Sequence, residues 1–204
     1  MPDLDSLLDQ VDEMRDETVA LEQDLVRIRT VNTGAMPTGN ETEACRYIEK
    51  WLAEDSIESE TIESATDRGN LIARLEGSSG KAGLMFMSHL DVVPVEEEEK
   101  WRFPPFSARV ADGRVFGRGA SDCKALLTCQ LVAMRILKRN NVELKDGLIL
   151  ASCADEEHGG RYGFGWMAEY HPEKLAAPYA VNEGGGIPIS AAGNLTYLLG
   201  IGEK

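Results

Sequence analysis

The chain has 204 residues, of which 43% are hydrophobic and 27% charged, as in an ordinary globular protein with one well-buried domain. Its formal net charge of −14 at pH 7 argues against nucleic acid and anionic membrane surfaces as partners. No segment approaches the ~20 apolar residues that span a bilayer. The four cysteines lack the spacing of a disulfide framework, so we expect reduced thiols in a cytoplasmic protein.

The N-terminal part of the chain predicts helices. Apolar residues recur at helical spacing over residues 4–28, and a break in the pattern at 15–18 favours two helices or a kinked one. Residues 30–39 are typical of a loop. Asn40 followed by Glu43 predicts the capped start of another helix.

The rest of the chain alternates between strand and helix patterns. Strands are expected at residues 70–76, 84–87, 148–154 and 179–182. Asp112-Gly113 predicts a hairpin within 108–117, and residues 122–139 predict a helix. The alternation indicates an α/β fold with a mostly parallel, mixed central sheet flanked by helices.

A histidine and an aspartate follow the apolar strand at 84–87. Residues two apart in an extended chain point the same way, so we expect His89 and Asp91 side by side at the carboxyl end of the strand. Open α/β sheets bind ligands at that edge, and a metal-bound imidazole commonly donates its second N–H to a carboxylate. The pair alone is also typical of a structural hydrogen bond.

Three further stretches carry acidic residues at strand ends or helix starts. The glycine-rich segment 117–124 lacks the spacing of a phosphate loop, and Asp122 within it would repel phosphate but attract a divalent cation. Residues 155–157, Asp-Glu-Glu, follow a buried strand, and their mutual repulsion indicates a nearby cation. Glu183 follows the last strand. A single acidic strand end is usually a helix cap or a solvated loop, but four in one chain predict a divalent-metal site.

Four motifs together resemble a known family. They are, in chain order, SHLDVVP, WRFPPFSARVADGRVFGRGASDCK, ADEEHGG and NEGGG. Their order and spacing are similar to those of the dizinc metallohydrolases that include aminoacylase, acetylornithine deacetylase, succinyl-diaminopimelate desuccinylase and glutamate carboxypeptidase. The resemblance runs from about Arg68 to Glu183 and implies a zinc-exopeptidase-like catalytic domain.

The resemblance implies a ligand set for two zinc ions. His89, Asp122 and Glu183 would hold the first ion. Asp122 would also bridge to the second ion, for which Glu157 would be a further ligand, and the peptide bond after Asp122 is often cis in the family. Cobalt or manganese would also suit a site this rich in carboxylates.

The resemblance also implies a reaction. Asp91 would orient the histidine ligand, and Glu156 would take the proton of a zinc-activated water that attacks an amide carbonyl. Substrates would be N-acyl amino acids or small peptides, cleaved in the manner of a deacylase or carboxypeptidase. Two alternatives stay open: a truncated, catalytically inactive metal-binding fragment, and a co-catalytic aminopeptidase.

The chain departs from the family at the second metal site. Family members carry another histidine ligand near their C-terminus, beyond a lid or dimerisation domain, and neither His158 nor His171 matches it. We therefore expect residues 1–204 to be the N-terminal portion of one catalytic domain, without the lid domain and the C-terminal catalytic segment. The full-length form would be a homodimer through the lid.

Overall fold

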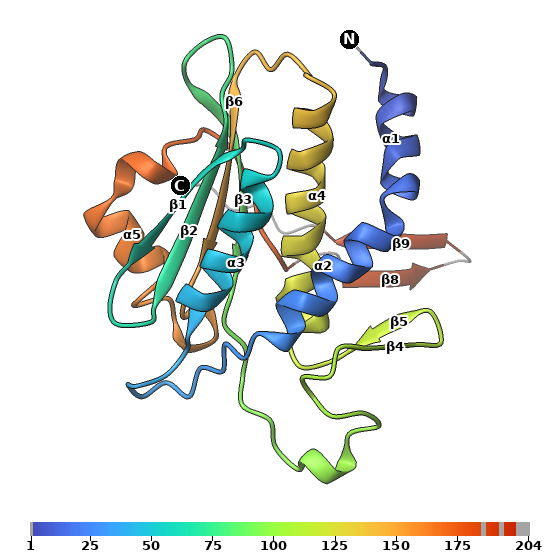
Figure 1. Ribbon diagram of the computed structural model, residues 1–204, viewed down its shortest axis with the longest axis vertical. Coiled ribbons are helices and arrows are strands. Elements are labelled where there is room, and N and C mark those ends of the chain that lie inside the picture. Colours follow the sequence, from blue (N-terminus) through green and yellow to red (C-terminus); the bar gives the residue numbers. More distant parts are fainter. Residues whose placement is uncertain (1, 185–186, 192–193, 199–204) are drawn as a thin grey trace.

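The computed structural model describes residues 2–184, 187–191 and 194–198, and Figure 1 shows their arrangement. The α-helices are α1 (Leu4–Glu13), α2 (Arg15–Arg27), α3 (Glu41–Ala53), α4 (Ala125–Arg139) and α5 (Phe164–Tyr170). The strands of the main sheet are β1 (Glu58–Glu63), β2 (Gly69–Leu75), β3 (Ala82–His89), β6 (Gly147–Cys153) and β7 (Ala180–Val181). Separate hairpins are formed by β4 (Arg109–Ala111) with β5 (Arg114–Phe116) and by β8 (Ile187–Ala191) with β9 (Asn194–Leu198).

The main sheet is mixed, as predicted. Its strand order is β1-β2-β6-β3-β7, with β3 parallel to β6 and β7, whereas β2 is antiparallel to both β1 and β6. Strand β1 was not predicted, because the residues of this edge strand are exposed or half-buried and its sequence, ESETIE, carries little apolar signal. No helix in the described ranges is both long and apolar enough to cross a membrane.

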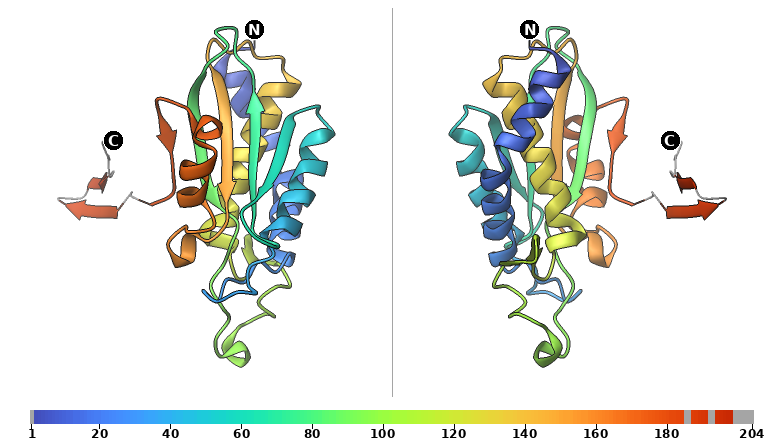
Figure 2. Two further views of the ribbon diagram at one scale, coloured as in Figure 1. Left: turned by 90° about the vertical axis from the view of Figure 1, so that its left-hand side faces the viewer. Right: turned by 90° about the vertical axis from the view of Figure 1, so that its right-hand side faces the viewer.

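Helices cover both faces of the sheet. Helices α2, α3 and α4 lie on one face and α5 on the other (Figures 1 and 2). The alternation of side chains along a strand divides the core accordingly: Leu148 and Leu150 pack toward the first group of helices, and Ile149 and Ala151 belong to the cluster beside α5. The β8–β9 hairpin extends away from this body (Figure 2).

Local predictions were confirmed in two places and wrong in two others. The first two helices meet at Met14. The β4–β5 hairpin turns at Asp112-Gly113, and these two residues have the positive φ angles (52° and 70°) that a type I′ turn requires. The helix predicted after Asn40 does begin at Glu41, but its side-chain cap was wrong, because Asn40 is left-handed and its amide donates to the Glu43 carboxylate rather than capping the backbone. The helix expected from residue 122 is regular only from Ala125.

The reason for the late start of α4 lies in two residues of the glycine-rich segment. Asp122 and Cys123 have non-helical dihedral angles (φ −123° and −126°), and the peptide bond between them is cis. The backbone there turns Asp122 outward, where the residue is exposed, while Cys123 is buried. Asp122 is thus set at the start of a helix that packs on the sheet.

The packing of the α5 start against the end of β6 can be tested at Gly163, where the two backbone segments approach closely. A Cβ atom there would lie 1.7 Å from the carbonyl oxygen of Ala154, at the end of β6. Replacing Gly163 with Ala should lower the free energy of unfolding by about 3 kcal/mol or more, because backbone must move. Gly80→Ala is the control. An alanine would be strained at the φ of +70°, but its surroundings are open, so the free energy of unfolding should fall by only about 1 kcal/mol. Equal losses in urea denaturation would contradict the close approach.

Candidate metal centre

Parallel pairing brings the predicted site residues to one edge of the sheet. His89, the last residue of β3, lies opposite Cys153, the last residue of β6, so the segments that follow both strands leave the sheet together. On the other side of β3, Phe86 pairs with Val181, which places Glu183 just beyond the end of β7. The carboxyl edge of the sheet therefore gathers residues that are far apart in sequence.

Three carboxylates surround the imidazole of His89. Its Nε2 atom lies 2.9 Å from Oδ1 of Asp122, 3.3 Å from Oε2 of Glu183 and 3.8 Å from Oε2 of Glu156. The histidine side chain is 1% exposed, whereas those of Asp122 and Glu156 are 71% and 48% exposed. His89 is thus the buried member of the site, and the carboxylates of Asp122 and Glu156 are exposed to solvent.

Asp91 contacts the other nitrogen of the His89 ring, Nδ1. Nδ1 of His89 donates to the backbone carbonyl oxygen of Asp91 at 2.9 Å and lies 3.5 Å from its carboxylate. Burial opposes the charged form of the imidazole, but Asp91, Cys123 and Glu183 together raise its pKa to about 12. These groups therefore favour the imidazolium over the neutral ring.

The Asp91 carboxylate also holds the acidic turn after β6. It is fully buried and accepts the backbone N–H groups of Glu156 (3.0 Å) and Glu157 (3.2 Å). Burial alone would raise its pKa, but the hydrogen bonds from His89 and Asn32 and the His89 charge lower it. Asp91 thus stays ionised in the interior and ties one strand end to the other.

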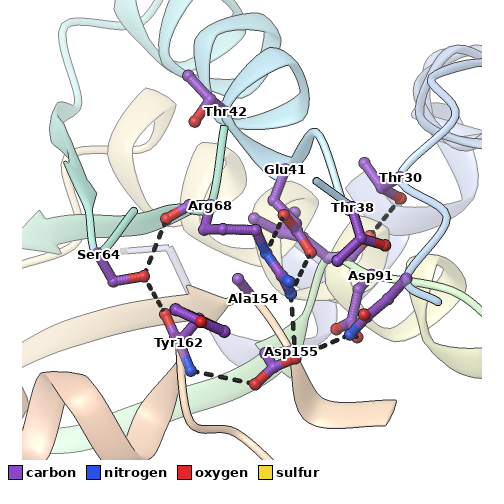
Figure 3. A network of polar contacts seen from close by, with 12 residues as sticks. Thr30, Thr38, Glu41, Thr42, Ser64, Arg68, Asp91, Ala154, Asp155 and Tyr162 are labelled. Atoms are coloured by element: carbon purple, nitrogen blue, oxygen red, sulfur yellow. Dashed lines mark hydrogen bonds and ion pairs between the residues drawn. The ribbon is translucent and has the colours of Figure 1, made fainter. Parts of the chain in front are cut away.

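One cation close to residues 155–157 is the buried side chain of Arg68, which pairs with Asp155. Figure 3 shows Arg68 between Glu41 and Asp155. Its Nη2 atom lies 3.2 Å from Oδ1 of Asp155, and its Nε and Nη2 atoms each lie 3.0 Å from a carboxylate oxygen of Glu41. Burial raises the pKa of Glu41 to about 7, although Arg68 opposes the shift. The repulsion among the carboxylates of residues 155–157 is thus relieved in part by the buried ion pair between Asp155 and Arg68.

The outer carboxylates remain crowded. Burial and then the nearby charge of Asp122 raise the pKa of Glu157, and burial raises that of Glu183 despite the opposing charge of His89. A dication would relieve this crowding. Ligand atoms of His89, Asp122, Cys123 and Glu183 all lie within 4.8 Å of one another, which suits a single metal ion. Glu157 is outside that group.

The thiol in this group is held by backbone contacts. Sγ of Cys123 accepts the N–H of His89 (3.1 Å) and donates to its carbonyl oxygen (3.3 Å), and burial raises the thiol's pKa. A thiolate ligand would have to give up the hydrogen bond that its proton makes. The thiol of Cys123 is thus engaged with the backbone of His89, and His89, Asp122 and Glu183 are the other members of the group.

The other two histidines lie elsewhere. His158 packs against the loop at Gly34, where a Cβ atom would meet its ring at 2.5 Å, and His171 lies against Trp166 with ring centroids 5.0 Å apart. Neither belongs to the metal-binding group found among the described residues. Asn32 and Glu41, which lie in the buried network around the site, were not singled out from the sequence, because the local sequence carries no signal for them.

The mixed sheet and its flanking helices define an α/β domain. The histidine and clustered carboxylates at the carboxyl edge of the sheet form a candidate metal centre. Residues 85–194 match the model of Peptidase family M20/M25/M40, and the chain belongs to this family. The resemblance seen in the four motifs is confirmed by this match.

Curated relatives agree with the family. A protein of Staphylococcus epidermidis named probable succinyl-diaminopimelate desuccinylase is 33% identical over 153 residues, which cover 75% of this chain and 36% of that protein. N-formyl-4-amino-5-aminomethyl-2-methylpyrimidine deformylase of Halalkalibacterium halodurans is 33% identical over 158 residues, covering 76% and 36%. The chain thus spans little more than a third of the length of these relatives.

Solved structures share the fold. An M20 family metallo-carboxypeptidase from Sulfolobus solfataricus superposes with a TM-score of 0.71 at 25% identity, covering 83% of this chain and 38% of that one. Human carnosine dipeptidase 1 gives a TM-score of 0.74 at 19% identity, covering 89% and 41%. Both likenesses extend over most of this chain.

The protonation of His89 gives a test of the site. In metal-free protein at about pH 8, NMR of the ring nitrogens should show an imidazolium, whereas an ordinary histidine, with a pKa of about 6.5, would be neutral. Adding zinc should remove the Nε2 proton, because a metal ligand must be deprotonated. Asp91→Asn is the control, since loss of that charge should lower the pKa of His89. A neutral ring in the metal-free wild type would contradict this electrostatic account.

Proposed function

We propose that this chain is part of a metal-dependent hydrolase that cleaves an amide bond in N-acyl amino acids or small peptides. The observation that carries the proposal is the convergence of His89, Asp122 and Glu183 at the sheet edge of an M20 family domain, with Glu156 beside them. Histidine and carboxylate ligands with an adjacent free glutamate are the parts that metal-assisted hydrolysis needs.

Zinc is the metal that we propose. His89, Asp122 and Glu183 would hold one ion, and Asp122 with Glu157 would contribute to a second. When bound, the metal supplies Lewis-acid activation of water and of the substrate carbonyl. One histidine among oxygen ligands suits zinc, and cobalt and manganese are the competing ions.

Glu156 is the proposed general base. Its carboxylate is 48% exposed and 3.8 Å from Nε2 of His89, while its backbone N–H is fixed to buried Asp91. A side chain with a fixed backbone and an open carboxylate can take a proton from the attacking water and deliver it to the leaving amine. Burial and then the charge of Asp122 raise the pKa of the neighbouring Glu157, and this proximity to Asp122 suits the role of a ligand.

The names of the relatives favour a deacylase. The desuccinylase and deformylase relatives are each named for removing an acyl group, while the two structural neighbours are named for peptide cleavage. We propose an N-acyl amino acid or a small peptide as the substrate, without nucleic acid or membrane as a partner. All four cysteines are free, which is compatible with the proposed cytoplasmic location.

We further propose that the chain is the N-terminal portion of a single catalytic domain. A lid domain and a later segment would supply the missing histidine of the second site, and the full-length form would be a homodimer. The second candidate function is metal binding without hydrolysis, favoured because the metal-binding group found among the described residues, His89, Asp122, Cys123 and Glu183, suits a single ion.

Metal analysis and hydrolysis assays separate these possibilities. Wild-type chain purified in dilute zinc should retain about one ion, and Asp122→Ala should lose it because a shared ligand is removed. Any hydrolysis of N-succinyl and N-formyl amino compounds should fall by about 10²–10⁴-fold in Glu156→Gln, which keeps the proposed ligands.

Each outcome has a distinct meaning. Zinc without hydrolysis would favour the non-catalytic alternative for residues 1–204, and about two ions per chain would mean that another residue completes the second site. A folded chain that binds no zinc would refute the proposed function.

A further inference from the structure

A buried asparagine lies beneath the candidate metal centre. Asn32 is 0% exposed, and its side-chain amide makes three hydrogen bonds. The Nδ2 atom donates to Oδ2 of Asp91 at 2.8 Å and to Oδ1 of Asp155 at 2.9 Å. One amide group thus bridges two buried carboxylates that come from different strand ends.

The orientation of this amide is determined by its third partner. The backbone N–H of Gly34 can only donate, and it lies 2.9 Å from Oδ1 of Asn32. The amide oxygen must therefore face Gly34, and the two amide hydrogens must face the carboxylates. The turn of the loop at Asn32 and Gly34 thus fixes the donors where two acceptors meet.

Each of the two carboxylates holds a different part of the site. Asp91 lies beneath His89 and accepts the backbone N–H groups of Glu156 and Glu157. Asp155 is anchored on its other side by Arg68 and by the backbone N–H of Tyr162. The Asn32 amide adds a side-chain link between these two groups of contacts, which the chain itself joins at Asp155-Glu156.

We infer that Asn32 is a positioning residue, whose amide locks Asp91 and Asp155 together and so fixes the turn bearing Glu156 and Glu157 relative to His89. Carboxylates repel each other, so without the shared donors Asp91 would be free to rotate away from the backbone amides that it accepts. The inference deepens the proposed function, because it concerns the same site and the geometry of its base and ligands.

Asn70 offers a matched and stringent control. It is also an asparagine with 0% exposure, and its amide also makes three hydrogen bonds. Its partners are all backbone groups, namely the carbonyl oxygens of Ile62 and Tyr162 and the N–H of Ala154. Asn70 therefore ties down the same region of chain without contacting either carboxylate.

Hydrogen exchange tests the positioning without any metal. In metal-free Asn32→Ala, the backbone amides of Glu156 and Glu157 should exchange at least about tenfold faster than in wild type, because their acceptor is no longer held. In Asn70→Ala these two amides should keep their protection, although the protein loses stability. Asn32→Ser, which keeps one donor, should give an intermediate loss and serves if the alanine variant does not fold.

Zinc affinity tests the consequence for the site. In competition with a chromophoric chelator, folded Asn32→Ala should bind zinc about 10–100-fold more weakly than wild type, while Asn70→Ala should match wild type. A merely structural role would lower stability in both variants without this difference in affinity.

Two results would overturn the inference. One is unchanged exchange at Glu156 and Glu157 in both Asn32 variants. The other is an equal loss of protection or of affinity in the Asn32 and Asn70 variants, which would indicate general loosening. A wild-type chain that binds no zinc would count against the proposed function, and the exchange data alone would then decide whether Asn32 positions the turn.

Discussion

The candidate site depends on one buried charge, the carboxylate of Asp91. Taking an ionised carboxylate out of water is costly unless donors replace its hydration. Here the donors come from the Asn32 loop and from the turn that carries Glu156 and Glu157, with the imidazole of His89 close by. Because all of these groups must stay in place to satisfy the carboxylate, it fixes their relative positions.

The surrounding charges form an inner and an outer layer. In the inner layer, buried Asp155 and Glu41 are compensated by Arg68, so the protein itself supplies the cation. In the outer layer, burial and then the charge of Asp122 raise the pKa of Glu157, and burial raises that of Glu183 despite the opposing charge of His89. An external cation would relieve the repulsion between these outer carboxylates, which include the proposed ligands.

The sequence could predict what depends on local pattern, and little of what depends on distant contacts. Apolar runs and the alternation of strand and helix patterns were enough to predict the mixed sheet. The positions of His89 and Glu183 at strand ends were enough to place them at one edge. The contact between Asn32 and Asp91 joins positions 59 residues apart, and that between Arg68 and Asp155 joins positions 87 apart. A loop asparagine gives no local sign of such a partner, because its role depends on how the strands pair.

The same network explains how adjacent acidic residues can have different environments. A regular strand would alternate its side chains, but Asp155 is left-handed (φ 66°) and Glu156 begins a short 3₁₀ turn. The left-handed conformation costs roughly 1–2 kcal/mol for a residue other than glycine. Hydrogen bonds from Asn32, Arg68 and the Tyr162 N–H to the Asp155 carboxylate offset that cost. The turn directs Asp155 into the protein and leaves Glu156 exposed, so the buried network sustains the backbone geometry on which a free base beside the metal ligands depends.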